Sequence, residues 1–163
     1  MSVTPDALKR LLGRRAASVA IVTARAGERV HGMTVTAFTE VSLEPPLVLV
    51  CADRSSNTHP VIEKGGVFAV NLLAQDQAAL SNRFASKKDE ERRFEGIAWE
   101  SAATGAPILP GTLGALDCRV VAAHDGGDHV IYVGRIEAIR CAPGREPLLY
   151  QSGAYGAFTP RES

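Results

Sequence analysis

The sequence predicts a mainly β protein, an antiparallel barrel, closed or partly open, with a few short α-helices at its edges. Six or seven segments have the composition or alternation of strands, whereas only three have the apolar spacing of a helix. Turns join most of these strands, and regular helical crossovers are missing, which favours antiparallel pairing over a parallel α/β sheet. With 163 residues, 45% of them apolar, the chain suits one packed core, so we expect a single domain over 1–163.

A short helix is expected first, lying on the body of the protein. Thr4 is a favourable N-cap, Pro5 suits the first helical position, Asp6 adds an acid to the first turn, and Gly13 ends the segment. Its apolar stripe consists of Leu8, Leu11 and Leu12.

Three strands are expected next. Residues 17–24 are rich in β-branched side chains, and the turn at 25–28 leads into a second strand, the first hairpin. Apolar and polar residues alternate imperfectly over 30–42. The prolines in 43–46 break this pattern before the apolar run 47–51.

The middle of the chain predicts helix, strand and helix in that order. Thr58 caps a short helix that ends at Gly65 and Gly66, and 67–73 forms the fourth strand. Residues 75–85 have helical spacing. The charged segment 86–93 is expected to be an exposed loop or helix end, and we assign no chemistry to it.

The last third predicts a second hairpin with a polar tip. Residues 105–114 are rich in Gly and Pro and are expected to be irregular. Strand signals over 116–122 and 130–139 flank a turn at 124–128.

Charge and cysteine usage limit the partners and the setting. Eighteen Lys and Arg balance eighteen Asp and Glu, so the excess positive charge of nucleic-acid and membrane-surface binders is missing, and we expect neither partner. No apolar stretch approaches the roughly 18 residues that span a bilayer. Cys51, Cys118 and Cys141 are odd in number and form no Cys-x-x-Cys pair, which favours a reducing, cytoplasmic setting.

Two clusters of small and hydroxyl-bearing residues indicate a cradle for a flat, phosphorylated ligand. The first is Thr34, Val35, Thr36 and Ala37, where small side chains let a planar ring approach the backbone. Thr34 and Thr36 would share one face of a strand and could bond the ring edge. Threonine is also common in strands that bind no ligand, so this cluster alone does not establish a ligand site.

The second cluster lies between an apolar strand and the expected helix start. It consists of Asp53, Arg54, Ser55, Ser56, Asn57 and Thr58. N–H groups at a helix N-terminus, three hydroxyls and a cation together favour an anion such as phosphate. The alternative is an ordinary capped loop, because Ser, Asn and Thr are also common capping and turn residues.

His129 is the candidate catalytic residue, as a proton donor or as a group that orients a substrate amide, with Asp128 beside it. A surface histidine without such a role is the alternative. His124 and His129 lack a third ligand at suitable spacing, so we expect no metal. The chain also has no Gly-x-Ser-x-Gly elbow, Gly-x-Gly-x-x-Gly loop or P-loop, so a hydrolase of that type, a Rossmann site and a P-loop site are not supported.

Over residues 17–155 the chain resembles the flavin reductase-like proteins, the short-chain NAD(P)H:flavin oxidoreductases with an FMN-binding split barrel. Four blocks in order carry the resemblance. They are GMTVTAF at 32–38, the apolar strand and CADRSSNT at 47–58, FAVNLLAQDQAALSNRFA at 68–85, and GDHVIYVGRI at 127–136 followed by PLLYQSGAY at 147–155.

The resemblance implies a homodimer of six-stranded Greek-key barrels that binds FMN or FAD near the dimer interface and uses NADH or NADPH. The flavin ring would be lined by Thr34, Val35, Thr36 and Ala37, and the ribityl chain and phosphate would lie near Asp53, Ser55, Ser56 and Thr58. Arg83, with Ser81 and Asn82, would approach the phosphate or the nucleotide tail. His129 would lie on the nicotinamide side of the flavin, and Tyr155 near the pocket mouth.

The implied reaction passes a hydride from nicotinamide to flavin, and the reduced flavin then serves a separate monooxygenase. The protein would stack the rings and exclude water, with no obligatory acid or base. Two alternatives remain open. One is a protein of the same fold that holds its flavin tightly and reduces a corrinoid, an iron complex or a quinone-like molecule. The other is a non-catalytic flavin- or haem-binding module.

Overall fold

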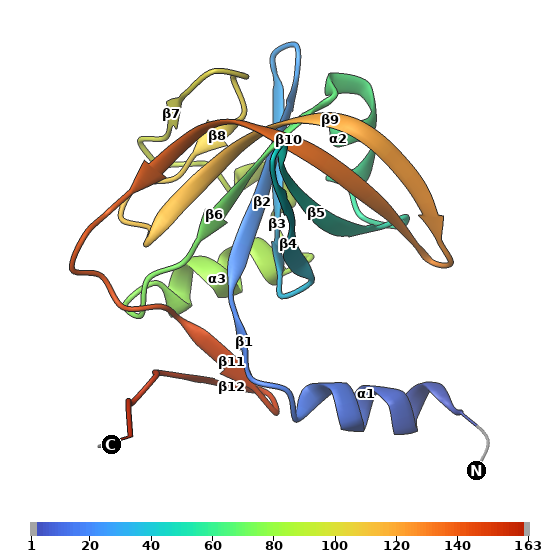
Figure 1. Ribbon diagram of the computed structural model, residues 1–163, viewed down its shortest axis with the longest axis vertical. Coiled ribbons are helices and arrows are strands. Elements are labelled where there is room, and N and C mark those ends of the chain that lie inside the picture. Colours follow the sequence, from blue (N-terminus) through green and yellow to red (C-terminus); the bar gives the residue numbers. More distant parts are fainter. Residues whose placement is uncertain (1–2, 162–163) are drawn as a thin grey trace.

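The computed structural model describes residues 3–161 and consists mainly of antiparallel strands (Figure 1). The main sheet contains β2 (Ala20–Ala26), β3 (Arg29–Val35), β4 (Phe38–Leu43), β5 (Pro46–Asp53), β6 (Val67–Leu72), β9 (Gly114–Gly126) and β10 (His129–Cys141). A three-stranded sheet contains β1 (Ala17–Ser18), β11 (Leu149–Gln151) and β12 (Ala154–Gly156). A two-stranded sheet contains β7 (Glu100–Ser101) and β8 (Pro107–Ile108). The helices are α1 (Pro5–Gly13), α2 (His59–Gly65), α3 (Ala78–Ala85) and the short 3₁₀-helix η1 (Glu90–Arg92).

The main sheet curls because its two edge strands are neighbours in the chain. Its order is β3-β2-β6-β9-β10-β5-β4, so β3 and β4 lie at opposite edges and only Thr36 and Ala37 join them. The Ala37 carbonyl accepts a hydrogen bond of 3.2 Å from the N–H of Cys51 in β5. The mainly β class with short flanking helices is therefore confirmed, and the sheet is a barrel split between β3 and β4.

The strand count differs from the expected six because the segment 30–42 is two strands. β3 pairs with β2, whereas β4 pairs with β5, and the chain changes partner at Thr36. The alternation of side chains continues across this break, so the pattern alone does not reveal it. The main sheet accordingly has seven strands.

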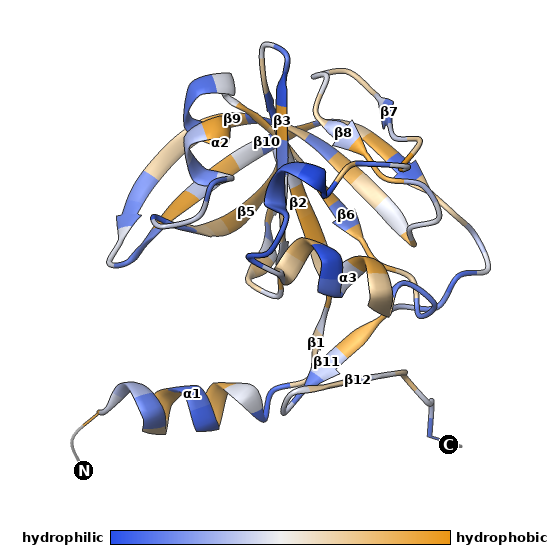
Figure 2. Cartoon of the chain, turned by 180° about the vertical axis from the view of Figure 1, so that it is seen from behind, coloured by the Kyte–Doolittle hydropathy of each residue, from blue (hydrophilic) through white to orange (hydrophobic). Residues whose placement is uncertain are grey.

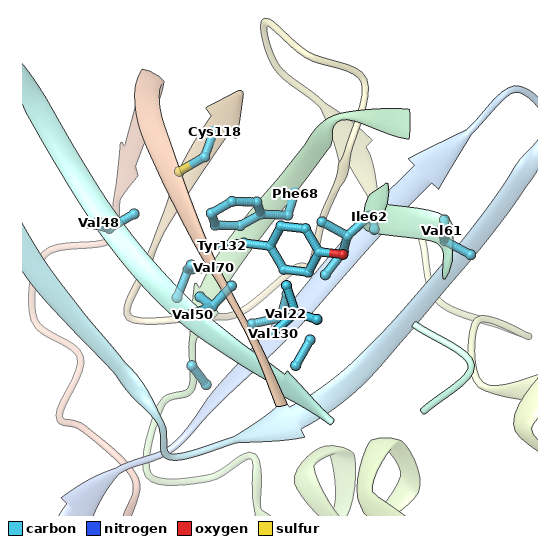
Figure 3. Packing of buried hydrophobic residues seen from close by; sticks show 13 residues of the cluster. Val22, Val48, Val50, Val61, Ile62, Phe68, Val70, Cys118, Val130 and Tyr132 are labelled. Carbon is cyan, nitrogen blue, oxygen red and sulfur yellow. The ribbon is translucent and has the colours of Figure 1, made fainter. Parts of the chain in front are cut away.

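A core of valines and aromatic rings fills the barrel (Figure 3). Phe68 of β6 and Ile62 of α2 are fully buried, and the ring of Tyr132 lies between them in the close view. The apolar residues of α2 close this core, and Gly66 ends the helix in the left-handed conformation at φ 65°, as its position predicted. A second buried cluster includes Ile21 on the other side of β2 and Phe84 of α3.

Four local expectations are corrected. α1 does not lie on the body: no residue of it is buried, and it extends away from the barrel, with bands of apolar and polar residues along its length (Figure 2). α3 starts at Ala78 instead of residue 75, and the second hairpin turns within Gly127 and Asp128 instead of 124–128. The segment 86–93 is not simply exposed, because Arg93 is 4% exposed.

Candidate functional site

The segment 34–37 lies between α3 and the end of β5. Thr34 is the last but one residue of β3, and its hydroxyl donates a hydrogen bond of 2.7 Å to the carbonyl of Ser81 in α3. Ala37 is exposed and bonds β5 through the N–H of Cys51. The segment therefore runs from the helix that covers one side of the barrel to the strand that leads into the loop 53–58.

A pocket of about 320 Å³ opens beside this segment. Four distant parts of the chain form it: Val19 just before β2, the end of β3 with Thr36, helix α3, and the hairpin of β11 and β12. Six of the predicted cofactor-binding residues line it, namely Thr34, Val35, Thr36, Ser81, Asn82 and Tyr155. These residues are far apart in the sequence, so the fold alone brings them together.

Tyr155 joins the C-terminal hairpin to α3 at this pocket. Its hydroxyl lies 2.8 Å from Ser81 Oγ and 2.8 Å from Asn82 Oδ1. Its ring packs edge-on against Tyr150 of β11, with ring centroids 5.3 Å apart. One wall of the pocket thus combines aromatic faces with hydroxyl and amide groups, which suits a planar ring with polar edges.

The loop 53–58 folds around the carboxylate of Asp53. Oδ1 of Asp53 accepts hydrogen bonds of 2.7 Å from both the N–H and the hydroxyl of Ser55, and these bonds hold the pKa of Asp53 below its ordinary value. Ser56 Oγ accepts a bond of 3.2 Å from the N–H of His59. Thr58 is buried, and its hydroxyl lies 2.8 Å from Nδ1 of His31 instead of capping α2. The helix begins after Thr58, as predicted, but without a side-chain cap.

Arg54 and His129 connect this loop to the tip of the β9–β10 hairpin. The Arg54 guanidinium donates to the carbonyl of Gly127 at 3.2 Å and pairs with Asp125. His129 lies opposite Asp53 in the pairing of β10 with β5, and its Nδ1 is 2.7 Å from Asp128 Oδ1. The side chain of His129 is 39% exposed beside this loop.

Arg83 contacts the chain that follows α3. Its Nη2 donates hydrogen bonds of 2.7 Å and 2.6 Å to the carbonyls of Arg92 and Glu95. The same guanidinium lines a shallow hollow of about 370 Å³ together with Lys88 and Arg92. The predicted residues thus form a band from Tyr155 across 34–37 to the loop 53–58 and His129, with Arg83 at one side.

Sequence reasoning missed a group of residues just below this band. His31 and Arg93 are buried at 2% and 4% exposure, and both meet Glu90 of η1. His31 lies immediately before the motif 32–38, and Arg93 ends the charged run 86–93. No spacing connects residues 31 and 93, so only the folded chain could reveal the group.

The family model for the flavin reductase like domain matches residues 12–159. The chain belongs to the flavin reductase-like family. One relative is the FMN reductase (NADH) SmoA of Agrobacterium fabrum, which is 41% identical over 151 residues, 93% of this chain and 84% of that protein. Another is the reductase subunit HsaB of a flavin-dependent monooxygenase of Rhodococcus jostii, 35% identical over 98% of this chain and 80% of that protein.

A solved structure within the flavin reductase-like family has the same fold. The NADH:FAD oxidoreductase SgcE6 of Streptomyces globisporus, in complex with NAD and FAD fragments, superposes with a TM-score of 0.90. The two sequences are 31% identical, and the match covers 100% of this chain and 99% of SgcE6. The split barrel described above is therefore the barrel of this family.

Two further features of this flavin reductase-like chain lie apart from the band of predicted residues. A wider hollow of about 740 Å³ is lined by residues 74–76 and 143–146, and these two segments also contact each other through the N–H of Gln75 on the Glu146 carbonyl and an ion pair of 3.2 Å between Arg145 and Asp76. None of the predicted site residues lines that hollow. Within 3–161, no helix has both the length and the apolar composition needed to cross a membrane.

Proposed function

We propose that this chain is an NADH-dependent flavin reductase that passes a hydride from the nicotinamide to FMN or FAD. One observation carries the proposal: in a chain of the flavin reductase-like family, six predicted cofactor-binding residues from three distant segments line one pocket. NADH is preferred to NADPH in this proposal because the names of relatives such as SmoA specify NADH.

The residues of the band fit a flavin. The nicotinamide would supply the hydride and the flavin would accept it, so the protein needs no obligatory acid or base. Thr34, Val35, Thr36 and Ala37 would contact the ring, with small side chains that permit close approach. Asp53, Arg54, Ser55 and Ser56 would lie near the ribityl chain and phosphate, whereas Thr58 is fully buried against His31 and would support this loop from below. Ser81, Asn82 and Tyr155 would line the other side of the pocket, and Arg83 would approach the phosphate or the nucleotide tail. His129 would orient the nicotinamide.

A separate monooxygenase is the proposed user of the reduced flavin. Relatives named as reductase components of flavin-dependent monooxygenases support this part of the proposal. We place the protein in the cytoplasm, because Cys51, Cys118 and Cys141 are all free thiols.

A homodimer completes the proposal. Leu8, Leu11 and Leu12 on α1 are 46%, 67% and 55% exposed, although they form one apolar stripe. A helix of nine residues is marginal in water unless its apolar face is covered. We propose that a second copy of the chain covers this apolar stripe.

The direct test follows the oxidation of NADH and NADPH by the purified protein, with and without added FMN, FAD or riboflavin. The proposal predicts turnover that requires free flavin, saturates with it and prefers NADH. Flavin that stays bound through gel filtration and supports turnover only with another acceptor would favour the tightly bound alternative. Flavin binding with no turnover under any of these conditions would contradict a reductase.

A further inference from the structure

A polar cluster underlies the candidate flavin site, with His31, Thr58 and Arg93 buried, Glu90 partly exposed and Asn57 exposed at its edge. It consists of His31 of β3, Asn57 and Thr58 of the loop 53–58, Glu90 of η1, and Arg93 just after η1. We call it the His31 cluster. Charged and polar side chains are rarely buried unless they are bonded to one another, so a group of this kind below a ligand site has a specific role in its structure.

The contacts of the cluster connect the three segments that carry the predicted flavin contacts. His31 Nδ1 lies 2.8 Å from Thr58 Oγ1, which joins β3 to the loop 53–58. Arg93 donates from Nη1 to the carbonyl of Gly32 at 2.7 Å and from Nη2 to the carbonyl of Ser86. Gly32 lies two residues before Thr34, and Ser86 caps the C-terminal end of α3.

Glu90 lies at the centre of these contacts. Its Oε2 accepts a hydrogen bond of 3.0 Å from Asn57 Nδ2, and it lies 3.5 Å from Arg93 Nη1 and 3.4 Å from His31 Nε2. The hydrogen bond from the Asn57 amide, and next the Arg93 guanidinium, hold the pKa of Glu90 below its ordinary value. One carboxylate thus meets the loop 53–58, β3 and the chain after α3.

The carboxylate of Glu90 also determines which ring nitrogen of His31 carries the proton. With a carboxylate facing Nε2, the neutral ring places its N–H on Nε2, and the Thr58 hydroxyl then donates to Nδ1. Among residues 3–161, Nε2 of His31 and Nε of Arg93 are buried without a hydrogen-bond partner. The carboxylate of Glu90 is the charge that faces both groups, at 3.4 Å from His31 Nε2 and 3.5 Å from Arg93 Nη1, so the cluster depends on it.

We propose that His31, Glu90 and Arg93 are positioning residues for flavin, which hold the segment 34–37, the loop 53–58 and the end of α3 in one arrangement. None of the three lines the 320 Å³ pocket, so they act through Thr34, Thr58 and their neighbours. Preorganised segments do not have to be ordered when the ligand binds, which strengthens binding. This inference rests on the proposed function.

The test replaces Glu90 by glutamine and uses Glu95→Gln as the matched control. Glu90→Gln keeps the size of the side chain and an oxygen for Asn57, but removes the charge that faces His31 and Arg93. Glu95 is a neighbouring exposed carboxylate that pairs with Arg92 at 3.0 Å, outside the cluster. Because a charge-assisted buried contact is lost, we expect the KM for FMN to rise about tenfold in Glu90→Gln, with kcat at saturating FMN within about twofold.

Amide hydrogen exchange gives a second readout that needs no turnover. Glu90→Gln should increase exchange in both 34–37 and 53–58, and leave the pairing of β6 with β9 unchanged. Glu95→Gln should match the wild-type protein in kinetics and in exchange.

The possible results separate this inference from the proposed function. An unchanged KM for FMN in Glu90→Gln, an equal loss of kcat and of flavin affinity, or faster exchange confined to 90–93 would overturn the positioning role. A wild-type protein that does not oxidise NADH with any flavin would instead refute the proposed function. The exchange measurement alone would then show whether Glu90 holds the three segments together.

Discussion

At the scale of single residues, the polar side chains of the site are organised by their partners. The Asp53 carboxylate accepts a hydrogen bond from the Ser55 hydroxyl. The Tyr155 hydroxyl donates to Ser81, and the Thr34 hydroxyl donates to a backbone carbonyl of α3. Each of these contacts joins two segments or closes one turn. Side chains that face the ligand region are therefore held before any ligand arrives, which reduces the ordering that binding requires.

Replacing His129 by alanine should weaken the binding of NADH more than the binding of flavin. His129 is partly exposed at the start of β10, while the flavin ring is assigned to 34–37. We expect the KM for NADH to rise about tenfold, equivalent to about 1.4 kcal/mol, and the Kd for FMN to stay within about twofold. His124→Ala, an exposed histidine on the same hairpin, is the control. Unchanged kinetics for both ligands would remove His129 from the site.

The stability of the protein should fall when the pH drops below 6.5. Burial, and next the Arg93 guanidinium, lower the pKa of His31 from its ordinary value of 6.5, and they outweigh Glu90, which raises it. Arg29 lowers and Glu91 raises the same pKa to a smaller extent. The unfolded chain therefore takes up a proton at a higher pH than the folded chain does.

This contribution is fully present above pH 6.5 and is lost as the pH falls from 6.5 towards the lowered pKa. The free energy of unfolding from denaturant titrations at a series of pH values should show this slope, and an NMR titration of the His31 ring should give a midpoint below 6.5. A midpoint at or above 6.5 would mean that the imidazolium is tolerated in the cluster.

At the scale of elements, the barrel depends on close approach between strands that do not pair. Phe68 of β6 reaches past β9 to β10, where Gly134 follows a shift in register. A Cβ at Gly134 would lie 2.5 Å from the Phe68 ring and 3.0 Å from Cys118. The curvature of the sheet thus brings a large ring against a strand position that admits only hydrogen.

We therefore expect Gly134→Ala to destabilise the protein by about 1–3 kcal/mol, the usual cost of overpacking a buried site. Chemical denaturation would measure the loss. Gly156→Ala is the control, because a Cβ at Gly156 has no neighbour within 4 Å. Equal stability of the two variants would show that Phe68 moves without cost.

At the scale of the whole molecule, α1 is a helix whose apolar residues the single chain leaves exposed. Its C-terminal end is fixed, since the Gly13 carbonyl accepts a hydrogen bond of 2.6 Å from the N–H of Ser152, but its leucine stripe faces solvent. The proposed homodimer predicts that Leu8→Glu separates the copies. Sedimentation should then report a monomer, while Arg10→Glu on the polar side of α1 should remain a dimer. A monomeric wild-type protein would refute the dimer.

Much of the fold follows from the sequence because its signals are local. Thr4 and Pro5 start α1, Gly66 ends α2 at positive φ, and the β-branched runs form strands, all through interactions within a few residues. The break at Thr36 has no such signal, because the change of pairing partner from β2 to β5 is a property of the sheet. For the same reason the sequence alone predicted one strand there.

The sequence by itself determined the fold class, the family, and the residue types that suit a flavin, because composition, periodicity and ordered motifs survive in the unfolded chain. Only the tertiary structure decided that Thr34, Ser81 and Tyr155 share one pocket, that Thr58 bonds His31 instead of capping α2, and that Arg93 is buried. These facts depend on contacts between residues tens of positions apart, which exist only after the sheet has curled and brought its edges together.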